Sequence, residues 1–171
     1  YDARGNLLSI TDPNGNTTRY SYDTDNNPLS VTDPRGNTTS HTYDSRGRVL
    51  TITDPDGRTT SNSYDDRGNL LRSVDPTGGT YLFAYDDAGN LTAVTDPRGN
   101  RISYDYDAYN NIAAITDMNG KTTRFSHDIS GNLLTVKDPA GKITTHAYDA
   151  LNRLVAITDP LGNTRKFTYD N

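Results

Sequence analysis

The sequence predicts an all-β fold, in which antiparallel β-hairpin repeats of 21 residues form a curled or spiralling single-layer sheet. The dipeptide Tyr-Asp returns every 21 residues from Tyr1-Asp2 to Tyr169-Asp170, and His127 replaces the ring once. Each repeat also contains two turn signals, separated by segments that alternate apolar and polar residues with a period of two. Eight tandem repeats therefore account for residues 1–171.

The first turn of each repeat begins at the Asp of Tyr-Asp. Three residues later the chain has Gly, or Asn at positions 26, 110 and 152. Because Asn is the common non-Gly residue that tolerates a positive φ, this exchange indicates a left-handed residue. We expect a four-residue loop, at residues 24–27 in the second repeat, because it would place Tyr22 opposite Leu29 and Tyr20 opposite Val31.

The first strand of each repeat is a short segment such as residues 6–11. Leu8 and Ile10 are apolar, whereas the residues that alternate with them are mostly Ser, Thr or Ala in the other repeats as well. Such a segment is too short for a stable helix and is typical of a strand with one apolar face.

The second turn has the sequence Asp-Pro-x-Gly in seven of the eight repeats, and Met118 replaces Pro in the sixth. Pro with its fixed φ at the second corner and Gly at the fourth predict a type I turn followed by a left-handed residue. A three-residue loop after Asp12 would pair Asp12 with Asn16, Ile10 with Thr18 and Leu8 with Tyr20.

The second strand, residues 16–22 in the first repeat, carries aromatic rings at alternate positions, Tyr20 and Tyr22. Its other side chains are mostly Thr, Ser, Arg and Lys, which suit a face in contact with water. The fourth repeat departs from the pattern at Ser73-Val74 and doubles the turn glycine at Gly78-Gly79, so we expect a local bulge there.

The composition limits the fold and the partners of the chain. Only 32% of the residues are hydrophobic and there is no Trp, which disfavours a thick central core. The net charge is −5 and both signs are interspersed, so nucleic acid is not an expected partner. No apolar run approaches the roughly 20 residues that span a bilayer, so we expect no membrane insertion by this segment.

The predicted ribbon has two strands for each of eight repeats and runs for roughly 75 Å along its arc. An open sheet of this width must curl or twist. If it curls with its Tyr, Leu and Ile face concave, the rings of neighbouring hairpins stack into ladders and the Thr, Ser, Arg and Lys face becomes the outer wall. A parallel β-helix with one coil per repeat is the alternative topology. Because the sequence begins and ends in mid-pattern without capping repeats, we interpret it as a segment of a longer repeat array.

The pattern Tyr-Asp-x-x-Gly-Asn-Leu followed by Thr-Asp-Pro-x-Gly-Asn-x-Thr, as at residues 1–17, resembles the Rhs/YD-repeat family over the whole chain. That family includes bacterial polymorphic toxins, B and C components of insecticidal toxin complexes, wall-associated proteins and teneurins. The resemblance implies a β-hairpin strip wound into a hollow shell, which in the bacterial members encloses a toxic C-terminal domain. Toxin members also have a core region with an aspartyl autoprotease, and this sequence contains neither. Asp159-Pro160-Leu161-Gly162 is similar to the family's terminal signature, but it is in phase with the other turns.

The candidate reactive residues are better explained by structure than by chemistry. Asp at every turn is explained by hydrogen bonds to backbone N–H groups, whereas a catalytic carboxylate pair would occur once. Residues 23–27 and 54–57 place oxygen ligands at alternate positions as calcium loops do, yet both lack the distal Glu of such loops. We therefore predict no catalytic residue, no cofactor-binding residue and no metal site.

Three further features can each be interpreted as structural or as functional. His41, His127 and His146 replace aromatic rings, which favours packing over a metal-binding or proton-transfer role. The Tyr stripe could stack on a carbohydrate or an extended peptide, but a single-layer sheet needs such a face for its own stability. The Asn-x-Thr sequons at Asn16, Asn37 and Asn90 matter only in a eukaryotic secretory setting.

These observations favour a non-enzymatic, secreted or cell-surface segment without a cofactor. The leading hypothesis is the wall of a hollow β-shell that encapsulates a C-terminal toxin or effector. Its partners would be the rest of its own repeat array and the enclosed domain. One alternative is a cell-surface adhesion or glycan-binding segment with a surface glycan or protein as partner. The other is an extracellular fibre that self-associates through open strand edges.

Overall fold

The computed structural model describes residues 1–170, which contain strands and turns and no helix. Consequently, no helix of the described part could span a membrane. The strands of the first four repeats are β1 (Ser9–Thr11), β2 (Thr17–Tyr22), β3 (Pro28–Thr32), β4 (Thr38–Tyr43), β5 (Val49–Thr53), β6 (Thr59–Tyr64), β7 (Leu70–Val74) and β8 (Thr80–Tyr85). Those of the last four are β9 (Leu91–Thr95), β10 (Arg101–Tyr106), β11 (Ile112–Thr116), β12 (Thr122–His127), β13 (Leu133–Lys137), β14 (Ile143–Tyr148), β15 (Leu154–Thr158) and β16 (Thr164–Lys166).

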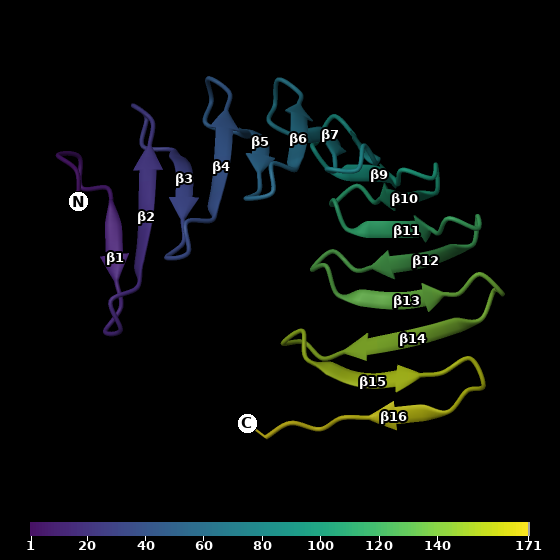
Figure 1. Ribbon diagram of the computed structural model, residues 1–171. Helices are drawn as coiled ribbons and strands as arrows, with labels where there is room; N and C mark the ends of the chain where they lie inside the picture. Colours follow the sequence, from purple (N-terminus) through teal and green to yellow (C-terminus); the bar gives the residue numbers. More distant parts are fainter. Residues whose placement is uncertain (171) are drawn as a thin grey trace. The chain divides into compact units, whose positions relative to one another are not determined.

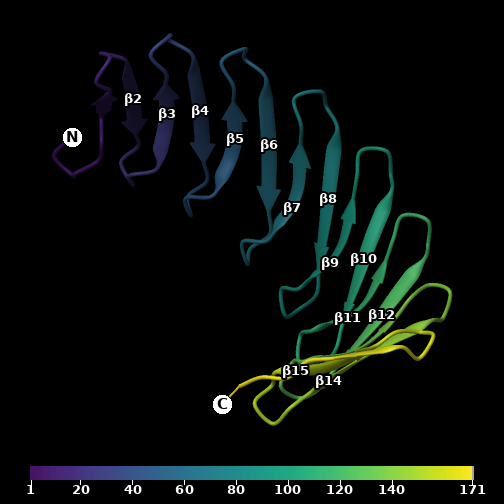
Figure 2. The same ribbon diagram turned by 90° about the horizontal axis from the view of Figure 1, so that it is seen from below.

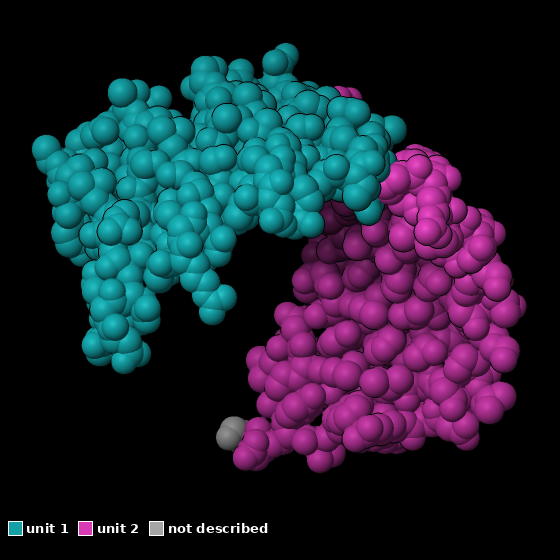
Figure 3. Space-filling model, viewed as in Figure 1, with its two compact units in different colours: residues 1–82 teal, residues 83–171 magenta. Residues whose placement is uncertain are grey.

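The 16 strands form one open antiparallel sheet in which each strand lies beside its neighbours in the sequence (Figure 1, Figure 2). This order confirms the predicted fold of consecutive hairpins and excludes a parallel β-helix. The chain divides within β8 into two compact units, Tyr1–Leu82 and Phe83–Asn171 (Figure 3). In a meander of this kind the Tyr-Asp turns lie along one edge of each unit and the Asp-Pro turns along the other.

The Asp-Pro turns have the predicted three-residue loop. The N–H of Asp12 donates to the carbonyl of Asn16 at 3.0 Å, and the N–H of Gly15 donates to the carbonyl of Asp12 at 3.0 Å. Gly15 has a φ of 85°, the left-handed conformation that the turn requires. Ile10 pairs with Thr18 in the β1–β2 ladder, which confirms the predicted register.

The Tyr-Asp turns differ from the prediction, because their loop has three residues and not four. The N–H of Asp23 donates to the carbonyl of Asn27 at 3.0 Å, and Asn26 has a φ of 68°. The odd residue is absorbed by a β-bulge in the next strand: Tyr22 pairs with Pro28, Ser21 pairs with Ser30, and Leu29 is the extra residue. Tyr20 still pairs with Val31 as predicted, so only the pairing of Tyr22 with Leu29 was wrong.

The fourth repeat contains no extra bulge at its Asp-Pro turn, so that prediction was also wrong. Ser73 pairs with Tyr81 and Val74 with Thr80, in the register of the other repeats. Elsewhere the corresponding pair has the large apolar residue on the first strand, as in Ile10 with Thr18. In the fourth repeat the small residue, Ser73, is on the first strand and the large residue, Tyr81, is on the second. Because the pair still contains one large side chain, the register does not need to change.

The two faces of the sheet differ in chemistry. On one face, rings pair with aliphatic side chains of the next strand, as Tyr104 does with Ile115 and Phe125 with Val136. The opposite face has hydroxyl pairs, such as Thr11 with Thr17 at 2.8 Å. Among the described residues only Ala93 and Ala114 are buried, with 3% and 6% of their surface exposed. The sheet is therefore one layer thick, and its stability must come from contacts between neighbouring strands.

Met118→Pro is expected to stabilise the chain. Met118 occupies the turn corner that is Pro in the other seven repeats, and it follows Asp117 in the same turn hydrogen bonds. Pro would reduce the freedom of the unfolded chain without a new clash, which should add about 0.4–1 kcal/mol to the free energy of unfolding. Urea denaturation of the two proteins measures the difference, and a lower midpoint for the variant would contradict this account.

Candidate functional site

The carboxylates of the turn Asp residues bind groups of their own turn. In the first Asp-Pro turn, Asp12 Oδ1 accepts from the backbone N–H of Asn14 at 2.8 Å and of Asn16 at 2.9 Å, and Asp12 Oδ2 accepts from Asn16 Nδ2 at 2.8 Å. The first Tyr-Asp turn repeats this arrangement with Asp2, Arg4 and Asn6 at 2.8–2.9 Å. Both turn types thus use the same Asp-x-x-Gly/Asn chemistry, with or without Pro.

These hydrogen bonds keep the turn carboxylates ionised. For Asp12 the largest cause is the side-chain amide of Asn16, followed by the backbone N–H of Asn16, and together they lower the carboxyl pKa. For Asp44 the backbone N–H of Arg48 is the largest cause of the lowered pKa. A carboxylate with a lowered pKa is a poor general acid, which argues for a structural role. The pKa is lowered at fifteen turn residues: Asp2, Asp12, Asp23, Asp33, Asp44, Asp54, Asp65, Asp75, Asp86, Asp96, Asp107, Asp117, Asp128, Asp149 and Asp159.

In the two segments with the spacing of calcium loops, carboxylate oxygens already bind neighbouring groups of the protein. Asp23 accepts from the N–H groups of Asp25 and Asn27 at 2.9 and 2.8 Å. In the other segment, Arg58 lies 2.7 Å from Asp54 and 3.0 Å from Asp56. Within residues 1–170 the structure brings together no group of three or more His, Cys, Asp or Glu side chains that could hold a metal ion.

Tyrosine hydroxyls connect successive repeats at the Tyr-Asp edge. Tyr43 donates to the carbonyl of Pro28 at 2.7 Å, and Pro28 is part of the β-bulge of the preceding repeat. Desolvation by its neighbours and, second, the charge of Asp23 raise the pKa of Tyr43, so it remains a donor. Tyr64, Tyr106 and Tyr169 make the same bond to residues 49, 91 and 154 at 2.9, 2.9 and 2.7 Å.

The residue that follows the left-handed position forms a second set of connections. Asn6, Asn90 and Asn132 each donate to the side-chain oxygen of an Asn in the next Tyr-Asp turn, at 2.7, 2.9 and 2.8 Å. Arg48 replaces Asn in the third repeat, and its guanidinium lies 4.9 Å from the ring centre of Tyr64 and donates to the carbonyl of Asp65. By contrast, the carboxylates of the Asp-Pro turns, such as Asp12 and Asp96, accept hydrogen bonds from N–H groups of their own turn.

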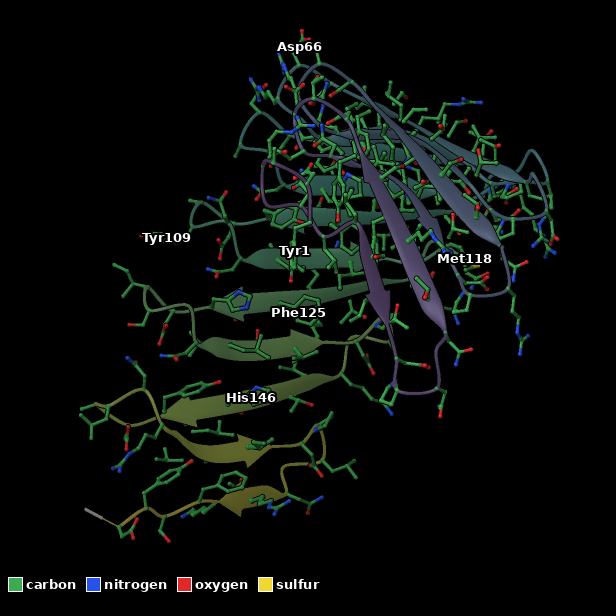
Figure 4. All side chains as sticks on the ribbon, turned by 60° about the vertical axis from the view of Figure 1, so that its left-hand side comes forward. Tyr1, Asp66, Tyr109, Met118, Phe125 and His146 are labelled. Carbon is green, nitrogen blue, oxygen red and sulfur yellow. The ribbon has the colours of Figure 1, made fainter. Side chains whose placement is uncertain are left out.

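The three His residues lie at ring positions of the apolar face, as their place in the repeat predicts. His41 pairs with Ile52, and His146, which is labelled in Figure 4, pairs with Ile157. The Nδ1 atoms of His41, His127 and His146 are buried without a hydrogen-bond partner. His127 replaces a repeat Tyr, and its Nδ1 lies 3.7 Å from Asp107 Oδ2. The structure therefore brings each His next to apolar strands and does not bring the three together.

Tyr106→Phe is expected to lower the free energy of unfolding by about 0.5–1.5 kcal/mol, because it removes the hydroxyl that donates to the carbonyl of Leu91. Tyr109→Phe is the matched control, since Tyr109 is 64% exposed at a turn. Equilibrium denaturation of both variants measures the difference. Equal midpoints for the two variants would show that the hydroxyl contributes nothing.

Residues 1–123 match the family model described as Teneurin YD-shell. The chain belongs to the teneurin YD-shell family. Residues 106–145 and 148–171 of this YD-shell segment also match the model described as RHS Repeat. Together the two matches confirm the family resemblance seen in the turn motifs. No curated protein matches the sequence.

Solved structures with the fold of the YD-shell segment include toxin complexes. One is described as the structure of the Photorhabdus luminescens Tc holotoxin pore with the mutation TccC3-D651A, at 16% identity and a TM-score of 0.69. The match covers 88% of this chain and 9% of the chain in that structure. Another, described as the crystal structure of TcdB2-TccC3-TEV, has 17% identity and a TM-score of 0.50. This match covers 96% of the present chain and 12% of the chain in that structure. The YD-shell segment thus spans about a tenth of the length of these chains.

In the structure, the Tyr and the Asp of the repeat have separate roles. The Tyr hydroxyl binds the bulge of the preceding repeat, as in Tyr43, and the Asp carboxylate closes its own turn, as in Asp23. The sequence motif showed the turn role of Asp. It did not show the hydroxyl contact, because the acceptor is 15 residues away and is set by the bulge.

Proposed function

We propose that this segment is a non-enzymatic part of the wall of a YD-repeat shell, and that the whole protein uses the shell to enclose a C-terminal toxin or effector for secretion and delivery. The observation that carries this proposal is the uniformity of the repeats. The turn carboxylates recur with the period and bind their own turn, which is a structural use of the residues that could otherwise do chemistry.

The contacts of the sheet suit a wall. The Tyr-Asp edge is connected from repeat to repeat by Tyr hydroxyls and by Asn and Arg side chains. The ring face offers an apolar lining, and the opposite face offers paired hydroxyls, as in Ser21 with Ser30 at 2.6 Å. In this proposal the partners are the remaining repeats and the enclosed domain, and the location is extracellular, either secreted or at the cell surface.

The test uses the complete protein that contains this segment. A hollow particle in electron micrographs, together with a C-terminal domain that resists protease until the array is denatured, is the expected result. The isolated C-terminal domain, digested under the same conditions, controls for the intrinsic protease resistance of that domain. A downstream domain that is digested as fast as the isolated domain would overturn the enclosure.

The match to a teneurin model favours a second candidate, a cell-surface adhesion segment that presents its polar face or turns to a glycan or a protein. In this case the whole protein would bind cell-surface glycans through the repeats. A glycan array probed with the full chain tests this, and an array without binding would remove the glycan-binding form of this candidate while leaving the shell proposal intact.

A further inference from the structure

Three consecutive Tyr-Asp turns of the second unit carry exposed apolar side chains at their tips. Tyr109, Ile129 and Leu151 are 64%, 81% and 71% exposed, and they lie in the turns that follow β10, β12 and β14. The corresponding tips of the first unit are charged, with Asp25 and Arg46 at the fourth position of the repeat, as for Tyr109 and Leu151, and Asp66 at the third, as for Ile129. A row of three apolar tips on consecutive turns is an exposed patch that the fold of the unit does not use.

Lateral contacts hold this row in place. Asn132 donates to Asn152 at 2.8 Å and so connects the turns that carry Ile129 and Leu151. His127 and Asp107 lie 3.7 Å apart and bring together the turns of Tyr109 and Ile129. Because consecutive turns are two strands apart, the tips repeat at about 10 Å. Turns that are connected to one another before binding lose less entropy on binding.

The opposite edge of the same unit is apolar in the same three repeats. Met118 and Leu161 are 56% and 86% exposed at the tips of the Asp-Pro turns, and Ala140 is exposed between them. Figure 4 shows Tyr109 and Met118 at opposite ends of the unit's strands. Between the turns after β11 and β13 lies a depression of about 400 Å³, lined by Lys121, Asp138, Pro139 and Ala140. One edge thus presents apolar projections, and the other presents apolar tips beside an open depression whose wall also contains Lys121 and Asp138.

The first unit shows the same correspondence with charges. In the second repeat Asp25 is the tip of one edge and Arg35 the tip of the other, and in the third repeat the signs are reversed, with Arg46 and Asp56. The depression between its first two Asp-Pro turns is polar, with Asp12, Asn16, Asp33, Pro34 and Arg35 in its wall. In the second and third repeats the two edges are therefore complementary in charge.

We propose that a second copy of the chain docks edge to edge, with Tyr109, Ile129 and Leu151 of one copy against Met118, Ala140 and Leu161 of the other. If one copy is shifted along the strand direction, each repeat lies against the same repeat of the other copy. The apolar tips of the Tyr-Asp turns then meet the apolar tips of the Asp-Pro turns. Such a contact is heterologous and leaves one free edge on each outer copy, so association is open-ended. Since few side chains take part, the contact is weak, with a Kd on the order of micromolar to millimolar.

Sedimentation equilibrium of the full chain over a concentration series tests the proposal. The variant I129D/L151D changes one edge and the variant A140D/L161D changes the other. Each substitution introduces a residue that another repeat has at the same turn position: Asp66 for Ile129, Asp25 for Leu151, and Asp56 for Ala140 and Leu161. The variants are therefore expected to fold. The wild-type mass should rise above 18.8 kDa with concentration, and each variant alone should remain a monomer.

A mixture of the two variants distinguishes docking of one edge against the other from non-specific association. Each variant keeps one intact edge, so the mixture should form 1:1 complexes and no larger species. The control T24D/S45D adds the same charge to the charged row of the first unit and should retain self-association. A wild-type chain that stays a monomer up to about 1 mM overturns the proposal, and so does a mixture without complexes. Equal melting temperatures of the variants show that loss of association is not loss of folding.

Discussion

Acidification is expected to unfold the chain in a steep transition below about pH 4, since fifteen turn carboxylates have a lowered pKa in the folded state. In the unfolded chain these groups return to the usual carboxyl pKa of 3.8. A group with a lowered folded pKa stabilises the folded state above its unfolded pKa, and this stability disappears as the pH falls through the folded pKa. The unfolded state therefore takes up more protons, and stability decreases toward acid.

The steepness of the transition is the informative quantity. One perturbed carboxylate would change the unfolding equilibrium by at most tenfold per pH unit, whereas many groups that act together raise this slope toward their number. Denaturant midpoints measured between pH 7 and pH 2.5 give the slope. Asp96→Asn is the matched control, because it keeps an oxygen acceptor for the N–H groups of Arg98 and Asn100 but cannot ionise. It should lower the slope by up to one proton, and a wild-type chain that becomes more stable in acid would contradict the assignment.

Gly99→Ala is expected to cost about 1–2 kcal/mol of unfolding free energy, since Gly99 has a φ of 83° in its Asp-Pro turn. A Cβ built at Gly99 has no atom within 4 Å, so the cost is conformational. Gly47→Ala should cost more, because its Cβ would lie 3.2 Å from Asn27 Oδ1 as well as requiring a φ of 76°.

The control for this prediction is Gly99→Asn. Asn26, Asn110 and Asn152 already adopt φ values of 68°, 64° and 61° in the equivalent part of the Tyr-Asp turns. Asn should therefore cost less than Ala at position 99, although Ala is smaller. Urea denaturation of the four proteins ranks them, and an Ala variant that is as stable as the Asn variant would show that the left-handed conformation is not required.

The strand pairing predicted across the Asp-Pro turns was correct, because the turn residues by themselves set it. Asp12, Pro13 and Gly15 specify one turn geometry, and the pairing of Ile10 with Thr18 followed from it. The Tyr-Asp loop was predicted one residue too long, because we required Tyr22 and Leu29 to be opposite each other. The signal for the tight loop was present in the sequence, since both turns share Asp, a left-handed residue three positions later, and a polar residue after it.

The fourth repeat shows why a departure from the pattern need not change the backbone. Ser73 at an apolar position suggested a bulge, but its partner Tyr81 supplies the missing volume from the neighbouring strand. This compensation acts between two strands, so it becomes visible only when the register is known. The row formed by Tyr109, Ile129 and Leu151 depends on the register for the same reason, because the three residues are 20 and 22 positions apart in the sequence.

By itself the sequence determined the 21-residue period, the antiparallel hairpins, the family and the turn role of Asp, because turn hydrogen bonds join residues at most four positions apart. Only the tertiary structure decided the bulge opposite Tyr22, the bond from the Tyr43 hydroxyl to Pro28 and the amide contact from Asn6 to Asn26. The hydroxyl and amide contacts join residues 15 and 20 positions apart, and one residue of slip in the ladder would separate them. Local chemistry fixes each turn, whereas the register between strands fixes how one repeat holds the next.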